Sequence, residues 1–391
     1  MTNGALIDRF RAIVGRRHVL TGLKATERFR RGFRSGEGEA LCVIRPGTLL
    51  ERWRVLQACV EADKIVIMQA ANTGLTEGST PSGSYDRDVV LINTRRMDKL
   101  IPLHDGKQVI SLPGSTLFDL EKLLAPMDRE PHSVIGSSCI GASIVGGVCN
   151  NSGGSLIERG PAYTELSVHA RIDAEGQLEL VNHLGIELGD TPEEILENLE
   201  SANFNTRPCA TNKRASSSDY ARIVRDVDAP TPARFNANKH KLYEASGSAG
   251  KLAVFAVRLD TFAKNTAEKV FYIGANDPRD LSDLRRHILT NFTTLPVSAE
   301  YVHRDVFDIT KTYGKDTVVM IDKLGTDRLP MFFALKGAVD ARLRKLPFLS
   351  NFTDRFMQIA SRFWPSILPK RMIEYRDRFE HHLILKMNNG G

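Results

Sequence analysis

The chain has 391 residues, of which 42% are hydrophobic and 26% charged, and its formal net charge at pH 7 is +6. This length predicts two or three domains, and the ordinary composition is typical of a soluble globular protein with enough chain to bury a core. The five cysteines include no C-x-x-C pair and no metal-ligand spacing, which excludes a disulfide framework and favours a reducing compartment.

The N-terminal residues predict a short amphipathic helix and not a secretory signal. Asp8, Arg9 and Arg11 interrupt the apolar core that a signal would need. The apolar residues that share one helical face are Ala5, Leu6, Phe10, Ile13 and Val14.

A β-α-β unit follows this helix. Residues 41–45 and 65–68 have the apolar runs of buried strands, and Thr48 can cap a helix with apolar periodicity over residues 49–62. The second strand leads into loop 1, "AANTGLTEGSTP" (residues 70–81), which has almost no side-chain bulk. Loops at the carboxyl ends of strands are where α/β sheets hold ligands, so loop 1 is a candidate binding loop.

Strands and helices alternate through the middle of the chain. Strands are predicted over residues 89–92, 109–112 and 252–259, a helix over 116–124, and a hairpin over 165–172 and 177–182. Thr191 and Glu194 form a capping box around Pro192, which predicts a helix to about residue 199. Residues 201–228 are polar and indicate a long excursion.

The composition changes near Lys264. Beyond it, residues 270–273 and 297–302 have strand patterns, and residues 279–289 have a helical pattern. These elements predict a second α+β unit.

Two further stretches are built from small residues. Loop 2, "GSSCIGASIVGGVCNNSGGS", covers residues 136–155, and loop 3, "ASGSAGK", covers residues 245–251 just before a strand. Small residues let backbone amides approach a ligand closely, and successive amides form nests that suit a diphosphate. The pattern is neither a G-x-G-x-x-G fingerprint nor a P-loop, and tight turns with close packing are the alternative explanation. Lys251 could contact a phosphate, but a solvated side chain explains it better.

Residues 134–157 carry no charge and are long enough to cross a bilayer. Six glycines, five serines and the pair Asn150-Asn151 make this stretch too polar and too loose for a helix that faces lipid. We therefore expect no spanning helix, and attachment to a membrane only at its surface.

Long stretches of the chain resemble the quinone-dependent respiratory D-lactate dehydrogenases of bacteria, which are flavoproteins of the vanillyl-alcohol-oxidase type. The matching stretches are "QAANTGLTEGSTP", "REPHSVIGSSCIGASIVGGVCNNSGGS", "RGPAYTELS" and "GKLAVFAVRLDTF". The resemblance implies an α+β fold: an N-terminal helical segment (residues 1–35), a PCMH-type FAD-binding domain of two α/β subdomains (36–264), and a partial cap domain with a basic membrane-associating segment (265–391).

The resemblance also implies non-covalent FAD, D-lactate as substrate and a membrane quinone as electron acceptor. The residues that it implies for the cofactor are Ala70, Ala71, Asn72, Thr73, Gly74, Gly78, Ser79, Gly136, Ser143, Gly153 and Val254. Gly74 is expected either to leave space for phosphate or to need a positive φ. His132 precedes loop 2 and keeps a covalent link open, because some flavoproteins of this fold tether FAD through a histidine.

Oxidation of D-lactate needs a base for the hydroxyl proton and a cation for the carboxylate. The resemblance implies a histidine base in an "E-H-N-x-G-H"-like segment, which this sequence does not contain, and relatives continue beyond the position of Gly391. We therefore expect a fragment or a truncated gene product with little activity of its own.

Four residues of the chain are lesser candidates for these roles. His381 and His382 are neighbours that should point to different faces. Packing or surface exposure explains them and His303 better than catalysis does. Arg159 either steers a carboxylate or forms an ion pair with Glu158 or Glu165. No cluster has metal-ligand spacing, so no metal is expected.

Residues 336–371 are strongly basic, with eight Lys and Arg against two Asp. Phe352, Phe356, Ile359 and Phe363 share one helical face, which predicts a basic amphipathic helix at an anionic membrane surface. A core-facing helix with a solvated basic face and a nucleic-acid patch are the alternatives. The need to reach a lipid-soluble quinone favours peripheral binding at the cytoplasmic face of the inner membrane, with no nucleic-acid partner.

Two other functions stay open. A related 2-hydroxyacid dehydrogenase would use the same cofactor on a different acid. A catalytically inactive FAD-binding or membrane-docking fragment would bind the flavin without turnover.

Overall fold

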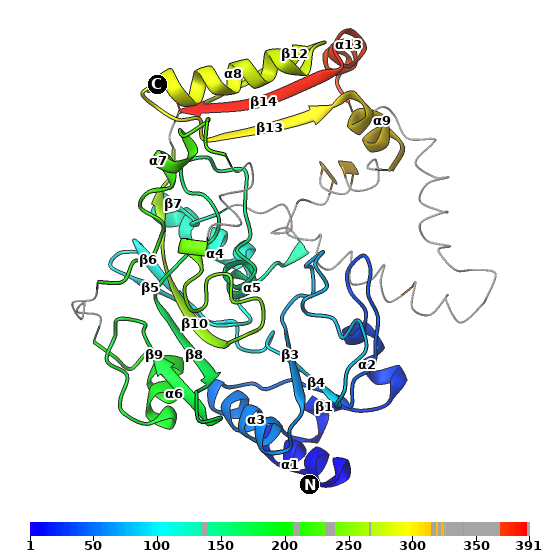
Figure 1. Ribbon diagram of the computed structural model, residues 1–391, viewed down its shortest axis with the longest axis vertical. Coiled ribbons are helices and arrows are strands. Elements are labelled where there is room, and N and C mark those ends of the chain that lie inside the picture. Colours follow the sequence, from blue (N-terminus) through cyan, green and yellow to red (C-terminus); the bar gives the residue numbers. More distant parts are fainter. Residues whose placement is uncertain are drawn as a thin grey trace, which may run out of the picture. The chain divides into compact units, whose positions relative to one another are not determined.

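The computed structural model describes residues 1–133, 140–205, 212–230, 239–265, 267–313 and 368–388, together with residues 318, 319, 322, 323, 325 and 339. The chain divides into two compact units (Figure 1). Unit 1 comprises Met1–Gly154, Arg159–Ser218 and Thr231–Lys264, and unit 2 comprises Ser155–Glu158, Asp219–Pro230 and Asn265–Gly391.

The first sheet of unit 1 has four strands in the order β1-β2-β4-β3. Its strands are β1 (Val19–Leu20), β2 (Cys42–Ile44), β3 (Ile65–Gln69) and β4 (Val89–Asn93). Both β2 and β3 pair in parallel with β4, so the predicted β-α-β unit exists but has a third strand between its two strands. The helices next to this sheet in the chain are α1 (Asn3–Val14), α2 (Leu23–Arg30) and α3 (Leu49–Glu61), with the 3-10 turn η1 (Arg16–His18).

The second sheet of unit 1 has five antiparallel strands in the order β5-β6-β10-β8-β9. These strands are β5 (Leu100–Leu103), β6 (Gln108–Ser111), β8 (Ser167–Ile172), β9 (Leu178–Asn182) and β10 (Ala253–Asp260). The remaining elements of unit 1 are α4 (Leu117–Leu124), α5 (Ile144–Cys149), α6 (Pro192–Ser201), η2 (Ala125–Met127), η4 (Lys239–Lys241) and the pair β7 (Arg129–Glu130) with β11 (Phe262–Ala263).

Helix α3 contributes to the cores of both sheets. Thr48 caps it as predicted, because its Oγ1 accepts a hydrogen bond from the Glu51 amide at 3.0 Å. The α3 residues that pack with α1 and the first sheet are Val55, Ala58 and Cys59. Those that pack with the second sheet are Leu49, Trp53 and Leu56. The two sheets therefore share one helix as their common core element.

Unit 2 contains an antiparallel sheet in which β14 (His381–Asn388) lies between β12 (Glu268–Ala275) and β13 (Ser298–His303). Its described helices are α7 (Tyr220–Val224), α8 (Pro278–Asn291), α9 (Arg304–Tyr313) and α13 (Lys370–Arg378). Leu281 and Ile288 of α8 pack with Leu383, Leu385 and Met387 of β14 to form the core. The middle strand thus comes from the last described segment of the chain.

Several predicted elements are confirmed, and others were missed. The capping box of Thr191 and the β8-β9 hairpin are present, and Leu6, Phe10 and Val14 form the buried face of α1, whereas Ala5 is exposed. The elements that were not predicted include α2, β5, α5, α9, α13 and β14. Within the described residues, no helix is both long enough and apolar enough to span a membrane. The predicted amphipathic helix, with Phe352, Phe356, Ile359 and Phe363 on one face, lies outside the described residues. Of the basic segment 336–371, only residues 339 and 368–371 are described.

Candidate functional site

Loop 1 leaves the end of β3 and is fixed by two amide side chains. Gln69 is 2% exposed, and its Nε2 donates hydrogen bonds to the carbonyls of Phe29 and Ser79, both at 2.8 Å. Asn72 has a left-handed φ of 57° and donates from Nδ2 to the Arg31 carbonyl at 2.6 Å. Its Oδ1 accepts from the hydroxyls of Ser79 and Thr80. The side chains of Asn72 and Ser79 therefore shape the loop itself.

This clamp leaves a run of backbone donors unused. Within the described parts of the chain, the amides of Ala71, Asn72, Thr73 and Gly74 donate no hydrogen bond to protein. A Cβ built on Gly74 would meet nothing within 4 Å, and its φ lies outside the left-handed region. The expectation that Gly74 needs a positive φ is therefore wrong, and the positive φ of this loop lies at Asn72 instead. The expectation that Gly74 leaves space for a phosphate stays a prediction. Consecutive free amides without bulk suit an anionic group such as a diphosphate.

Loop 2 contains a short helix that the sequence pattern did not reveal. Ser143 caps α5, since its Oγ accepts a hydrogen bond from the Gly146 amide at 3.2 Å. The Ile144 amide donates to the Ser115 carbonyl, which ties the start of α5 to the segment before α4. Gly153 is exposed in the segment after α5, and Gly136 lies outside the described residues.

The three small-residue loops come together at the C-terminal end of α5. A Cβ on Gly78 of loop 1 would lie 3.8 Å from Oδ1 of Asn150, the C-cap residue that directly follows α5. In loop 3, the amides of Gly247 and Ala249 donate to the carbonyls of Val148 and Cys149 at 3.0 and 2.9 Å. Residues far apart in the sequence thus border one region of unit 1.

Val254 and Lys251 differ in what they offer to this region. Val254 is 3% exposed, its side chain belongs to the core around α5, and its carbonyl accepts a hydrogen bond from Nη1 of Arg52 at 2.5 Å. Lys251 is exposed, which fits the solvated alternative. A contact of the cofactor with the Val254 carbonyl would therefore have to share that oxygen with Arg52.

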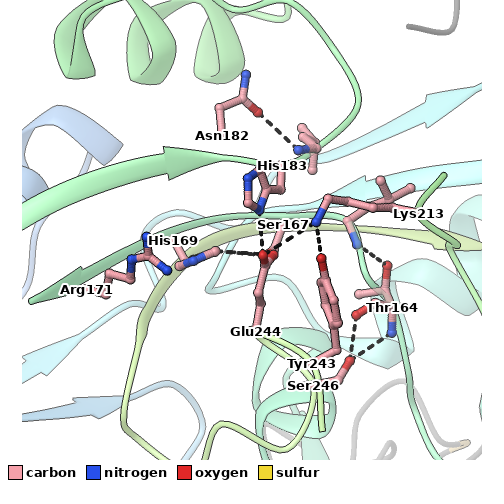
Figure 2. A network of polar contacts seen from close by, with 12 residues as sticks. Thr164, Ser167, His169, Arg171, Asn182, His183, Lys213, Tyr243, Glu244 and Ser246 are labelled. Carbon is pink, nitrogen blue, oxygen red and sulfur yellow. Dashed lines mark hydrogen bonds and ion pairs between the residues drawn. The ribbon is translucent and has the colours of Figure 1, made fainter. Parts of the chain in front are cut away.

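A network of charged and polar side chains fixes the start of loop 3 (Figure 2). Glu244 has a left-handed φ of 45° and directly precedes the loop. Its Oε1 lies 2.5 Å from Nδ1 of His183 and 3.6 Å from Nζ of Lys213, and its Oε2 lies 3.9 Å from Nδ1 of His169. Figure 2 shows these side chains converging on one carboxylate.

His169 is the buried member of the network. It is 1% exposed, its Nδ1 lies 3.0 Å from the hydroxyl of Ser167, and burial lowers its pKa to about 4. Nearby, the Ser246 hydroxyl donates to the Thr164 carbonyl and accepts from the Thr164 amide, at 2.7 and 2.9 Å. The sequence does not reveal this network, because its members are separated by long stretches of chain and share no motif.

The two adjacent histidines of β14 face opposite sides of the sheet, as predicted. His382 is fully buried beside the rings of Tyr272, Phe307 and Phe379, and burial lowers its pKa. His381 accepts or donates a hydrogen bond at Nδ1 with the Tyr301 hydroxyl at 2.7 Å. Nε2 of His303 lies 3.4 Å from Oε1 of Glu380. The surroundings of His382 are those of a packed core residue. A catalytic role for His381 or His382 stays a prediction.

Arg159 forms a structural ion pair, but with a different partner from those expected. Its guanidinium pairs with Glu130 and donates to the Pro131 carbonyl at 2.8 Å, and it does not pair with Glu158 or Glu165. The neighbouring His132 is 6% exposed, and burial lowers its pKa to about 4, so its imidazole is neutral at pH 7. Among the described residues, no cluster of three or more His, Cys, Asp or Glu could hold a metal ion.

Two family models match the chain. One describes an FAD binding domain and covers residues 40–177. The other is described as "D-lactate dehydrogenase, membrane binding" and covers residues 270–391. Unit 1 therefore contains a domain that binds FAD, and the free amides and lack of bulk in loop 1 fit that cofactor's diphosphate.

Three relatives match almost every residue of the chain, and each is named quinone-dependent D-lactate dehydrogenase. The relative from Escherichia coli (strain K12) is 59% identical over 392 residues, covering 100% of this chain and 69% of its own length. The relatives from Haemophilus influenzae and Corynebacterium glutamicum are 55% and 46% identical, covering 99% of this chain and 69% and 68% of their own lengths.

Solved structures with much lower identity share the fold. An alkyldihydroxyacetonephosphate synthase superposes with a TM-score of 0.57 at 11% identity, covering 99% of this chain and 56% of that one. A p-cresol methylhydroxylase with substrate bound gives a TM-score of 0.50 at 12% identity, covering 98% and 60%. The predicted α+β fold of the PCMH type is confirmed.

Proposed function

The chain belongs to the quinone-dependent D-lactate dehydrogenases, and from this premise we propose that it oxidises D-lactate to pyruvate and passes the electrons to a membrane quinone. The observation that carries the proposal is the 59% identity to a relative of that name along the whole chain. The FAD-binding domain supplies the electron carrier, because bound FAD can accept the hydride from C2 of a 2-hydroxyacid.

The chain's own contribution to FAD binding is proposed to come from its three small-residue loops. The amides of Ala71, Asn72, Thr73 and Gly74 would donate to the diphosphate, since no described protein group takes them. The other residues proposed to line the cofactor are Ala70, Gly78, Ser79, Gly136, Ser143, Gly153 and Val254. We propose non-covalent attachment, because loop 1 contains no histidine that could tether the flavin.

We propose that FAD binding belongs to residues 36–264, and that residues 265–391 form the cap and the membrane-associating part. The two compact units support a division after Lys264, and the two family models fall on either side of it. Residues 1–35 contribute α1, whose Leu6 and Phe10 pack in the core of unit 1 with α3.

Peripheral binding to an anionic bilayer at the cytoplasmic face is proposed for the second part. The membrane-binding family model covers it, and residues 336–371 are rich in Lys and Arg. Each basic side chain near such a surface contributes about 1 kcal/mol, and salt screens it. The protein should therefore sediment with phosphatidylserine vesicles at low salt and be released at high salt. Equal binding to neutral vesicles would contradict the charge-based proposal.

The proposed reaction can be tested directly on the flavin. The purified protein is loaded with FAD and mixed without oxygen with D-lactate, L-lactate or another 2-hydroxyacid. The identity to a relative named quinone-dependent D-lactate dehydrogenase replaces the earlier expectation of little activity. We now expect D-lactate to bleach the visible flavin band and L-lactate not to, and a ubiquinone analogue to restore the band. Faster bleaching by another 2-hydroxyacid would assign the related dehydrogenase activity, and bound FAD that no acid reduces would favour the inactive alternative.

A further inference from the structure

Arg52 is a fully buried cation with few partners. It lies on α3, is 1% exposed, and is the largest of the fully buried side chains. Its Nη1 donates to the Val254 carbonyl at 2.5 Å, its Nη2 lies 3.5 Å from the thioether sulfur of Met68, and its guanidinium carbon lies 4.3 Å from the ring centroid of Phe255. Its Nε is buried and has no hydrogen-bond partner in the described structure.

Two other buried arginines of unit 1 are paired much more completely. Arg258 is 6% exposed, and its guanidinium donates to Oε1 of Gln108 and to the carbonyls of Leu184 and Gly185. Arg30 is 7% exposed and donates to three different oxygen atoms. Arg52 has a single oxygen acceptor, and no carboxylate of the described residues offsets its charge.

A buried charge without a counter-ion opposes folding. A bound ligand of opposite charge would offset this cost. Burial lowers the pKa of Arg52 to about 9, so the side chain is still cationic at neutral pH. Its neighbours point to the missing partner. Met68 lies two residues before loop 1, and Val254 follows loop 3. The thiol of Cys149, the last residue of α5 in loop 2, also lies near the guanidinium. The cation therefore lies beneath the region where the three loops meet.

We propose that Arg52 is a positioning residue for FAD, whose buried guanidinium attracts the diphosphate through the protein interior without touching it. This inference rests on the proposed placement of the diphosphate against loop 1. Two opposite unit charges about 10 Å apart, at an effective dielectric constant of about 20, attract strongly enough to raise affinity about tenfold. Because the guanidinium is shielded from solvent, salt should screen this attraction only weakly.

The experiment compares three substitutions at this position. Arg52→Met and Arg52→Gln remove the charge, and Arg52→Lys retains it. Dissociation constants for FAD, ADP and riboflavin are measured on each apoprotein, and its unfolding is followed in denaturant. We expect both neutral variants to bind FAD and ADP about tenfold more weakly, with riboflavin affinity unchanged because riboflavin has no diphosphate. Arg52→Lys should stay close to the original affinity for all three ligands.

Arg258→Met is the matched control, because it removes a buried arginine that protein oxygens already surround. It should lower the denaturation midpoint of the apoprotein and leave the FAD dissociation constant unchanged. The proposal is overturned if Arg52→Met weakens all three ligands equally, or if Arg52→Lys binds FAD no better than Arg52→Met. It is also overturned if only the lysine variant folds, because the charge would then serve the fold. An original protein that binds no FAD would instead contradict the proposed function.

Discussion

Loops 1 and 3 meet the same end of α5, but different forces fix them. Loop 1 is held by the neutral amides of Gln69 and Asn72, which pair with backbone carbonyls and hydroxyls. Loop 3 is held by the carboxylate of Glu244 among His183, Lys213 and His169. Neutral hydrogen bonds contribute about 1 kcal/mol each and do not titrate near pH 7, whereas a half-buried ionic cluster is sensitive to the loss of one member and to pH. The protein thus places a pH-independent clamp beside a pH-dependent one.

Removing the centre of the ionic clamp should have the largest effect on stability. Glu244→Ala leaves Lys213 and His183 without their shared carboxylate, and we expect a loss of about 3 kcal/mol in the free energy of unfolding. Denaturant unfolding of the apoprotein measures it. The control is Glu179→Ala, which breaks an exposed pair with Arg171 and should cost less than about 1 kcal/mol. Equal losses in the two variants would remove the special role of Glu244.

Acid should loosen loop 3 before loop 1. The pKa of His169 falls from 6.5 to about 4 on burial, so below pH 6.5 the unfolded chain takes up a proton that the folded chain does not. Above pH 6.5 the neutral imidazole of His169 costs the fold nothing. As the pH falls toward 4, the free energy of unfolding decreases, and the decrease reaches about 2 kcal/mol at about pH 4.5. The slope of unfolding free energy against pH over this window should therefore be shallower in His169→Gln. His132 adds a similar dependence, because burial also lowers its pKa to about 4. An unchanged slope in His169→Gln would mean that the imidazole is protonated in the folded state.

Asn72 tests the neutral clamp. Asn72→Ala loses three hydrogen bonds and places alanine at a left-handed φ of 57°, and we expect a loss of about 1–2 kcal/mol together with weaker FAD binding. Asn72→Gly loses the same hydrogen bonds but tolerates the φ, so it separates the two contributions. Both variants should keep the original pH dependence of stability. A changed pH dependence would show that the two clamps are not independent.

The smallest stability effect is expected at Gly74, where the open space matters and the backbone conformation does not. Gly74→Val should change the unfolding free energy by less than about 0.5 kcal/mol, because a Cβ there meets nothing within 4 Å. It should nevertheless weaken FAD binding strongly by filling the space beside the free amides. The contrasting variant is Gly250→Ala in loop 3, where φ is +88°: stability should fall by about 1 kcal/mol. Full flavin retention by Gly74→Val would contradict the proposed placement of the diphosphate.

Elements with a local signal at their start could be predicted from the sequence. Thr48, Thr116 and Thr191 each cap the helix that follows, and in each case the hydroxyl accepts a hydrogen bond from the amide three residues later. Helix α5 was missed because Gly146 and Gly147 lower the helix propensity of a six-residue segment, although Ser143 was available as its cap. Strand β5 was missed because Pro102 interrupts its pattern, which is tolerated at the edge of the sheet.

The candidate site was predictable only in part. The lack of bulk in loops 1, 2 and 3 is visible in the sequence, because it extends over consecutive residues. The clamp around Glu244 is not, since His183 lies 61 residues from it along the chain and each partner alone is an ordinary polar residue. Arg52 likewise reads as one more polar position on a helix until Val254, 202 residues later, is placed against it.

The sharing of α3 by two sheets has a consequence for biosynthesis. The helix leaves the ribosome early, but Phe255, which stacks edge-on against Trp53 at 6.3 Å, is made about two hundred residues later. Until β10 emerges, the face formed by Leu49, Trp53 and Leu56 lacks part of its packing surface. Contacts this distant along the chain slow folding, and a nascent chain with exposed apolar side chains is prone to aggregate. We expect the growing polypeptide to depend on chaperones from the appearance of α3 until β10 has docked.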